Sequence, residues 1–249
     1  MVAMSSNLLH LNWPAAKQVN ALSTTRQGGF SKPPFDSFNL GLHVGDDQHD
    51  VQKNRTLLTQ SLPRTPKWLD QTHSADIIII DETNYQTYHT SQADGFYTRL
   101  FDVPLAIMTA DCLPIFLADK QGTQIAIVHG GWRGLAQGII KNTLSLFSSN
   151  PADVIAYLGP AIGPSAFEVG EDVVRSFSGD EFDKCFKKQM NGKFMADIFA
   201  IASVQLNALQ VEQIYSDKLC TFSDPERFFS YRRDGETGRL AHLIWLSKS

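Results

Sequence analysis

The sequence predicts a mixed-sheet α/β (α+β) fold. Seven short apolar runs rich in Ile and Val have the length of buried strands and are bounded by Asp, Gly or Pro. Three longer segments repeat apolar residues at helical spacing. Strands and helices alternate without the regular rhythm of a doubly wound parallel sheet, so we expect mixed sheets with helices packed against them.

The expected strands are residues 75–80, 105–109, 115–118, 124–129, 154–158, 211–215 and 240–246. The expected helices are residues 50–62, 135–147 and 196–209. In the second helix, Ala136, Ile139, Ile140, Leu144 and Phe147 recur at the spacing of one buried face. Residues 230–234 are interpreted as a solvated hairpin strand, which a turn at residues 234–238 connects to the last strand.

Composition and charge exclude several classes of protein. The 249 residues are 43% hydrophobic and 19% charged, which is typical of a globular chain, and we expect one domain over residues 1–249. The net charge of −4 gives no general attraction for nucleic acid or an anionic membrane. No apolar run approaches the roughly 20 residues of a membrane-spanning helix, and the N-terminus has no signal-peptide pattern. We therefore expect a cytoplasmic protein with reduced cysteines, and its oligomeric state stays open, a monomer included.

Reactive residues lie at the ends of several predicted strands. Cys112 follows the strand at 105–109, His129 ends the strand at 124–129, and His73 precedes the strand at 75–80. Binding sites gather where strands end, so these side chains are candidates for one site. One thiolate and two imidazoles suit a zinc ion with a fourth position open for water or substrate. Their spacing matches no zinc-finger pattern, and a buried thiol and a hydrogen-bonded strand-end histidine are the alternatives.

The same atoms allow two other interpretations. Cys112 is a candidate nucleophile with His129 as its base and Asp111 nearby, which would make the protein a cysteine hydrolase. A structural zinc site in a binding module is the other possibility, with Cys185 or Cys220 as fourth ligand. Dependence of activity on metal separates the catalytic alternatives.

A series of motifs in order along nearly the whole chain resembles one family. They include Thr-Arg-Gln-Gly-Gly at residues 25–29, Asn-Leu-Gly at 39–41, Gln-Thr-His at 71–73, Ala-Asp-Gly at 93–95, Thr-Ala-Asp-Cys-Leu-Pro at 109–114, His-Gly-Gly-Trp-Arg-Gly at 129–134, Gly-Pro-Ala-Ile-Gly at 159–163, and Ser-Tyr-Arg-Arg at 230–233. The chain resembles the laccase-domain family, also known as the multicopper polyphenol oxidase type, the YfiH-like purine nucleoside phosphorylases or peptidoglycan editing factors. It departs from the family at Gly130, where alanine is usual, and at Phe167, where tyrosine is common.

This resemblance implies a layered domain of the type found in the catalytic domain of cytotoxic necrotizing factor, a bacterial toxin. It implies zinc on His73, Cys112 and His129. It also implies phosphorolysis of adenosine, inosine, guanosine and methylthioadenosine, with inorganic phosphate as co-substrate, and deamination of adenosine. Under the family's cell-wall name the substrate would instead be a muramyl peptide, and the protein an amidase that edits peptidoglycan precursors.

The laccase name conflicts with the histidines. Multicopper oxidases hold several copper ions with His-x-His pairs, whereas this chain has 7 histidines and no such pair. We therefore expect one zinc site rather than copper oxidation.

Catalytic and substrate-binding residues are assigned on the same resemblance. Cys112 and His129 are expected to be catalytic as well as metal ligands, and Asp111 is a candidate proton carrier. The residues expected to bind phosphate, ribose or base are Arg26, Asn39, Gln71, Arg133 and Arg232.

Overall fold

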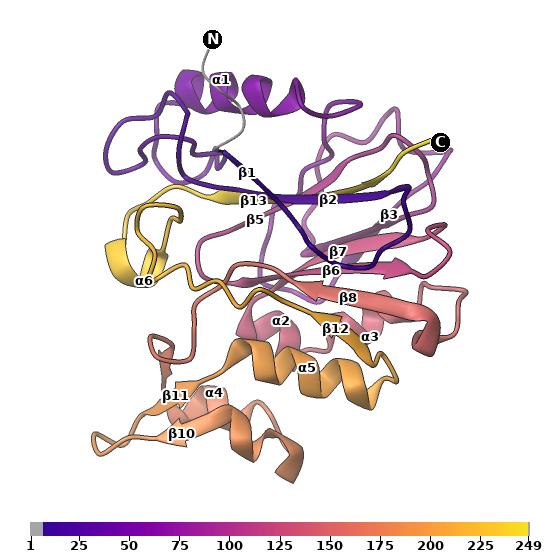
Figure 1. The fold of residues 1–249 in the computed structure, drawn as a ribbon. Coiled ribbons are helices and arrows are strands. Elements are labelled where there is room, and N and C mark those ends of the chain that lie inside the picture. Colours follow the sequence, from indigo (N-terminus) through magenta and orange to yellow (C-terminus); the bar gives the residue numbers. More distant parts are fainter. Residues whose placement is uncertain (1–6, 249) are drawn as a thin grey trace.

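Two β-sheets lie face to face, and helices cover their outer faces (Figure 1). The computed structural model describes residues 7–248. The four-stranded sheet has the order β1 (Leu8–His10), β2 (Val19–Thr24), β13 (Leu240–Leu246) and β5 (Leu105–Thr109). The six-stranded sheet has the order β12 (Gln213–Tyr215), β8 (Val154–Leu158), β6 (Leu113–Asp119), β7 (Ile125–Gly130), β4 (Gly95–Thr98) and β3 (Ile77–Ile80).

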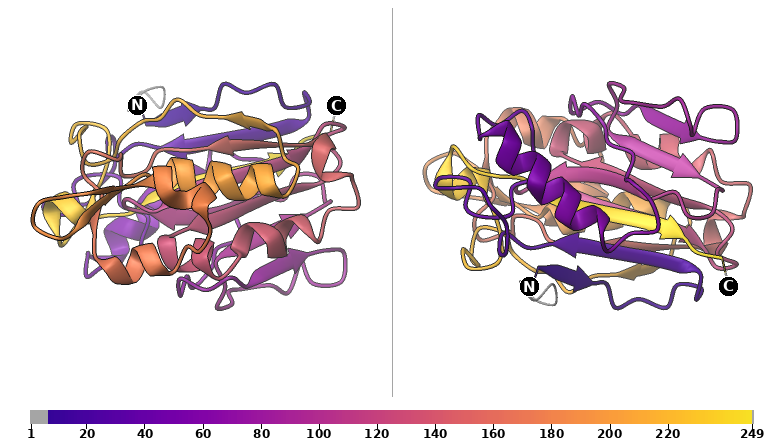
Figure 2. Two further views of the ribbon diagram at one scale, coloured as in Figure 1. Left: turned by 90° about the horizontal axis from the view of Figure 1, so that it is seen from below. Right: turned by 90° about the horizontal axis from the view of Figure 1, so that it is seen from above.

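The helices complete a four-layered arrangement. Helix α1 (Gln48–Thr59) crosses the outer face of the four-stranded sheet, whereas α2 (Trp132–Ala136), α3 (Ile139–Leu144) and α5 (Ile198–Ala208) cover the six-stranded sheet, as the two views of Figure 2 show. The remaining elements are β9 (Glu168–Val169), α4 (Glu171–Arg175), β10 (Phe186–Lys188), β11 (Phe194–Ala196) and α6 (Tyr231–Asp234), of which the strands form a small third sheet. Within residues 7–248, no helix is both long and apolar enough to cross a membrane.

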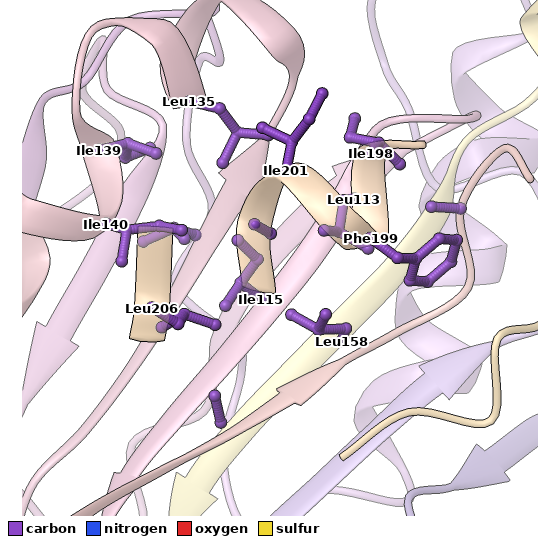
Figure 3. Close-up of a cluster of buried hydrophobic side chains, with 14 of the residues drawn as sticks. Leu113, Ile115, Leu135, Ile139, Ile140, Leu158, Ile198, Phe199, Ile201 and Leu206 are labelled. Atoms are coloured by element: carbon purple, nitrogen blue, oxygen red, sulfur yellow. The ribbon is translucent and has the colours of Figure 1, made fainter. Parts of the chain in front are cut away.

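Strand β6 is apolar on both faces because it lies between two cores. Leu113, Ile115 and Leu117 pack toward α2, α3 and α5, where Figure 3 shows Leu113 and Ile115 close to the side chains of α5. Phe116 and Ala118 point the other way, into the core between the sheets. This period-two division explains why β6 lacks the apolar–polar alternation of a strand with one solvated face.

The predicted fold class is confirmed. The six-stranded sheet is mixed, since β3–β4 and β8–β12 pair in parallel while the other neighbours are antiparallel. All seven predicted strands are present; three have the predicted bounds, and the ends of the other four differ by at most two residues. Strands β1, β2, β4 and β9 to β11 were not predicted, because they are short and lack a continuous aliphatic run.

All three predicted helices and one predicted strand differ from the structure. The helix expected over 50–62 spans Gln48–Thr59, where the Asp47 carboxylate accepts from the N–H groups of His49 and Asp50. The helix expected over 135–147 is broken, because Gly138 adopts a left-handed φ of 86° between α2 and α3. The helix expected over 196–209 starts at Ile198, where the Asp197 carboxylate accepts a hydrogen bond from the N–H of Ala200. Residues 231–234 form helix α6 rather than a strand, since the Ser230 hydroxyl caps the N–H of Arg233.

A neutral histidine is buried between the two sheets. His242 on β13 is fully buried, and its ring nitrogens lie 2.7 Å from the Ser23 hydroxyl and 2.8 Å from the Thr109 hydroxyl. Burial, reinforced by the charge of His129, lowers the pKa of His242 to about 3. One ring nitrogen therefore donates and the other accepts, and the imidazole holds β13 between β2 and β5.

We predict that His242 makes the fold sensitive to acid. Between its ordinary pKa of 6.5 and about 3, the unfolded chain binds a proton at this residue that the folded chain does not. The free energy of unfolding therefore falls with falling pH, by about 1.4 kcal/mol per pH unit from this group. Urea denaturation at pH 7, 6 and 5 measures the free energy of unfolding. This free energy should fall less steeply with falling pH for His242→Gln than for the parent. The exposed His89→Gln is the control, and equal slopes for the parent and His242→Gln would contradict the assignment.

Candidate active site

Three side chains distant in sequence converge at one point. His73 lies in the loop before β3, Cys112 in the connection from β5 to β6, and His129 near the end of β7. Their donor atoms all lie within 4.8 Å of one another, with Cys112 Sγ 3.9 Å from His73 Nε2. Pairing of Leu113 with Gly130 between β6 and β7 brings Cys112 beside His129.

A buried carboxylate organises the two histidines. Asp94, which immediately precedes β4, accepts a hydrogen bond of 2.7 Å from His129 Nδ1. It also accepts from the backbone N–H groups of Thr72, His73 and Ser74. These bonds hold the loop in which His73 adopts a left-handed φ of 61°. They also leave Nε2 of His129 as the nitrogen available to a metal.

Electrostatics couple these groups. Burial raises the pKa of Asp94, but hydrogen bonding to His129 and Ser74 outweighs it and keeps the pKa well below its usual range. Burial likewise opposes ionisation of the Cys112 thiol, but the charge and hydrogen bonds of His129 and His73 lower its pKa to about 6. Against the effect of burial, Cys112 and Asp94 raise the pKa of His129 to about 9. Without metal, the site thus favours a thiolate beside an imidazolium.

Asp111 fixes the backbone that presents Cys112. Its φ of 99° lies in the left-handed region, which is uncommon for a residue other than glycine. Its two carboxylate oxygens accept from the Thr221 hydroxyl at 2.6 Å and from the backbone N–H of Arg232 at 2.7 Å. Both oxygens of this buried carboxylate are therefore engaged in holding the turn before Cys112.

Gly131 gives the three ligands room to meet. A Cβ at this position would lie 3.0 Å from His73 Cδ2, 3.3 Å from Cys112 Sγ and 3.6 Å from His129 Cε1. Because Gly131 has an ordinary φ of −65°, the constraint is one of space rather than backbone strain. Gly131, the second glycine of the His-Gly-Gly-Trp-Arg-Gly segment, is thus closely packed against all three side chains.

The donor set fits a zinc ion. One sulfur and two imidazole nitrogens with a carboxylate behind one imidazole are typical of zinc sites that keep an open position. Among the described residues, this is the one group of three or more His, Cys, Asp or Glu that could hold a metal. Cys185 and Cys220 do not belong to it, so the structure provides neither as a fourth ligand.

His73, Cys112 and His129 line a pocket of about 410 Å³. Gln71, Met108 and Tyr231 line it beside the ligands, and His43 and Arg239 complete its wall. Gln71 Nε2 donates to the carbonyl oxygen of Met108, and Gln71 Oε1 accepts from the N–H of Met108. This pocket is large enough for a small organic ligand.

Of the five residues predicted to bind substrate, Gln71 lines this pocket and four lie outside its lining. Arg26 pairs with Asp36 over the ring of Phe229. The buried Asn39 amide bonds to the backbone of Gly41 in its own loop and accepts from the N–H of Arg239, which is distant in sequence.

The other two arginines face away from the ligands. Arg133 is exposed and stacks on Trp132. The Arg232 guanidinium donates to the carbonyl oxygens of Ala166 and Glu168. Both lie within motifs of the resemblance, but neither side chain belongs to the pocket lining.

The sequence interpretation assigned no role to Asp94, His43 or Arg239. Two signals were available: Asp94 stands directly before a buried strand in the motif at residues 93–95, and Arg239 ends the Thr-Gly-Arg segment at residues 237–239, which also matches the family. His43 and Arg239 are separated by almost the whole chain, and only the packing of their loops reveals that they share a pocket.

Comparisons with known proteins agree with this fold. A model of the family described as multi-copper polyphenol oxidoreductase laccase matches residues 20–247. Among the similar proteins, a purine nucleoside phosphorylase of Haemophilus influenzae is 45% identical over 240 residues, which are 94% of this chain and 97% of the relative. The purine nucleoside phosphorylase YfiH of Escherichia coli is 43% identical over 97% of this chain and 99% of its own length.

Solved structures show the same architecture. A crystal structure of a Neisseria meningitidis protein is 42% identical and superimposes with a TM-score of 0.92, over 97% of this chain and all of that one. YlmD from Geobacillus stearothermophilus is 34% identical with a TM-score of 0.89, over 97% of both chains. The chain therefore belongs to the multi-copper polyphenol oxidoreductase laccase family, together with the YfiH-like proteins.

Proposed function

We propose that the protein is a zinc-dependent purine nucleoside phosphorylase that also deaminates adenosine. The observation that carries the proposal is the group of His73, Cys112 and His129, which faces a pocket of about 410 Å³. The names of the relatives, purine nucleoside phosphorylase, supply the substrate class. Adenosine, inosine, guanosine and methylthioadenosine are the substrates we propose, with inorganic phosphate as co-substrate.

The three ligands would hold the zinc through one sulfur and two ring nitrogens. Bound there, zinc supplies a Lewis acid that stabilises negative charge and lowers the pKa of water. Asp94 orients His129 for this task through Nδ1. Asp111 is a positioning residue in this proposal rather than a proton carrier, because its two oxygens are occupied by Thr221 and Arg232.

Both reactions take place on a purine held in the pocket. In phosphorolysis a phosphate oxygen bonds to C1′ of the ribose while the bond from C1′ to the base breaks. The base leaves with the electron pair and takes up a proton. In deamination, water adds at C6 of adenosine and ammonia leaves. The purine base packs against the apolar side chain of Met108 and the exposed ring of Tyr231. Gln71 holds the backbone of Met108 by a hydrogen bond.

A second candidate is a cysteine hydrolase that acts on a peptide amide, such as a cell-wall precursor. The arrangement that favours it is Cys112 beside His129, with Asp94 behind the imidazole, which is the order of groups in a nucleophile–base–carboxylate triad. In this case the Cys112 thiolate would attack the amide carbonyl, the C–N bond would break, and the amine would leave with a proton from His129. Water would then hydrolyse the acyl-enzyme and release the acid. Metal would inhibit rather than support this activity.

We predict phosphate-dependent release of base from inosine and formation of inosine from adenosine. Chromatography of adenosine and inosine reactions, with and without phosphate and with and without a chelator, separates the possibilities. Base release requires phosphate, inosine formation does not, and both stop when zinc is removed. Activity that survives complete removal of metal would favour the cysteine hydrolase.

Cys112→Ala is predicted to abolish both activities and to lower the zinc content of the purified protein from near one ion per chain to near zero. The reason is that two imidazoles alone leave the ion without its thiolate. Elemental analysis and the two assays measure the effect. Cys185→Ala, which removes a buried thiol outside the site, is the control and should keep zinc and activity. Full turnover by Cys112→Ala would overturn the shared metal site.

Asp94→Asn is predicted to weaken zinc binding by about 10- to 100-fold, since loss of the carboxylate removes the acceptor that orients His129 and the loop of His73. Competition with a chromophoric chelator measures the affinity. Asp76→Asn, an exposed carboxylate two residues beyond the Asp94-bound loop, is the matched control. Zinc affinity equal to that of the parent would show that Asp94 does not support the ligands.

A further inference from the structure

Arg239 presents an uncommitted cation to the pocket. It lines the wall together with the three ligands, and its side chain is partly buried. Nη1 donates to the carbonyl oxygens of Thr237 and Gly238, which are its own neighbours in sequence. Within residues 7–248, Nε and Nη2 donate to no protein acceptor, and no carboxylate lies within ion-pair distance of the guanidinium. A partly buried guanidinium without an acidic partner favours an anionic ligand.

The loop at residues 39–41 is shaped to hold this arginine. Asn39 Oδ1 accepts from the N–H of Arg239 at 2.9 Å and from the N–H of Gly41 at the same distance. A Cβ on Gly41 would lie 2.8 Å from Cγ of Arg239, so the glycine makes room for its aliphatic stem. Asn39 and Gly41 therefore position Arg239, although neither residue lines the pocket.

The surrounding wall is also suited to an anion. In the described part of the chain, no Asp or Glu side chain lines the pocket. Cys112, then Tyr231 and Asp111, act on Arg239 electrostatically, and the guanidinium lies 6.0 Å from the centroid of the Tyr231 ring. The Asp111 oxygens already accept from Thr221 and Arg232. His43 lines the same wall, and burial, followed by the charges of Arg239 and Arg55, lowers its pKa, so it is a neutral donor at pH 7. Arg55 contacts Met108 from behind, with Nη2 3.7 Å from Sδ.

We propose that Arg239, with His43 beside it, binds the phosphate group used at this site. This proposal rests on the function proposed above, and it assigns the residues that bind phosphate, which the proposed function leaves open. The ligand is a phosphate oxyanion, either inorganic phosphate as co-substrate or the phosphoryl group of a nucleotide. A guanidinium offers two parallel N–H donors to such an oxyanion, and Nε and Nη2 provide that pair.

Steady-state kinetics of the zinc-loaded enzyme test the co-substrate role. Arg239→Gln should raise the KM for phosphate in inosine phosphorolysis by about 10- to 100-fold, while the KM for inosine changes much less. Arg239→Lys keeps the positive charge but loses the two parallel N–H donors of the guanidinium, so its KM for phosphate should lie between those of Arg239→Gln and the parent. Arg133→Gln removes an exposed guanidinium at the start of α2 and should keep the parent's KM for phosphate.

Direct binding separates this proposal from the proposed function. Equilibrium binding of inorganic phosphate and of inosine 5′-monophosphate is measured for the parent, Arg239→Gln, Arg133→Gln and Cys112→Ala, with zinc content determined in each. Loss of phosphate binding in Arg239→Gln at full zinc content supports inorganic phosphate as the ligand. Loss of nucleotide binding alone supports the phosphoryl group of a nucleotide.

Two results would overturn the subsite. One is phosphate and nucleotide binding in Arg239→Gln equal to that of the parent. The other is phosphate binding that disappears in Cys112→Ala or Arg133→Gln but persists in Arg239→Gln, since the anion would then sit on the metal or on α2. A parent that binds phosphate through Arg239 but releases no base from any nucleoside would retain the subsite and overturn the proposed function instead.

Discussion

The site depends on the buried carboxylate of Asp94. It receives the N–H groups of a three-residue loop from one side and the His129 ring from the other. A buried carboxylate without partners is costly, so each donor stabilises the charge and is itself held in place. His73 and His129 are thus oriented by one charge, although they belong to a loop and a strand that are far apart in sequence. The positions of His73 and His129 both depend on this single carboxylate.

The double-sheet architecture provides the rigid frame for that interaction. Strand β5 belongs to the four-stranded sheet and β6 to the six-stranded sheet, so residues 110–112 must cross from one layer to the other. The left-handed Asp111 makes this crossing possible, and Thr221 and Arg232 hold its carboxylate. Cys112 therefore projects at the edge where the two layers separate, beside the end of β7. Core packing on both faces of β6 keeps this edge from shifting.

Arg26, Arg232 and Arg239 differ in where their side chains lie. Arg26 pairs with Asp36 and the Arg232 guanidinium donates to two carbonyl oxygens, and neither side chain lines the pocket. Arg239 keeps two donors for an outside acceptor. Neighbouring residues in the sequence do not show which arginine lines the pocket, because that depends on how distant loops pack together.

Local patterns in the sequence determined seven of the strands, the mixed fold class and the candidate set of His73, Cys112 and His129, because apolar runs and strand-end residue types depend on neighbours along the chain. Tertiary structure alone decided the rest. The break at Gly138, the engaged oxygens of Asp111 and the meeting of His43 with Arg239 depend on contacts between distant segments. Hydrogen-bond satisfaction and burial are properties of three-dimensional neighbours, and the order of residues does not specify which donor reaches which acceptor.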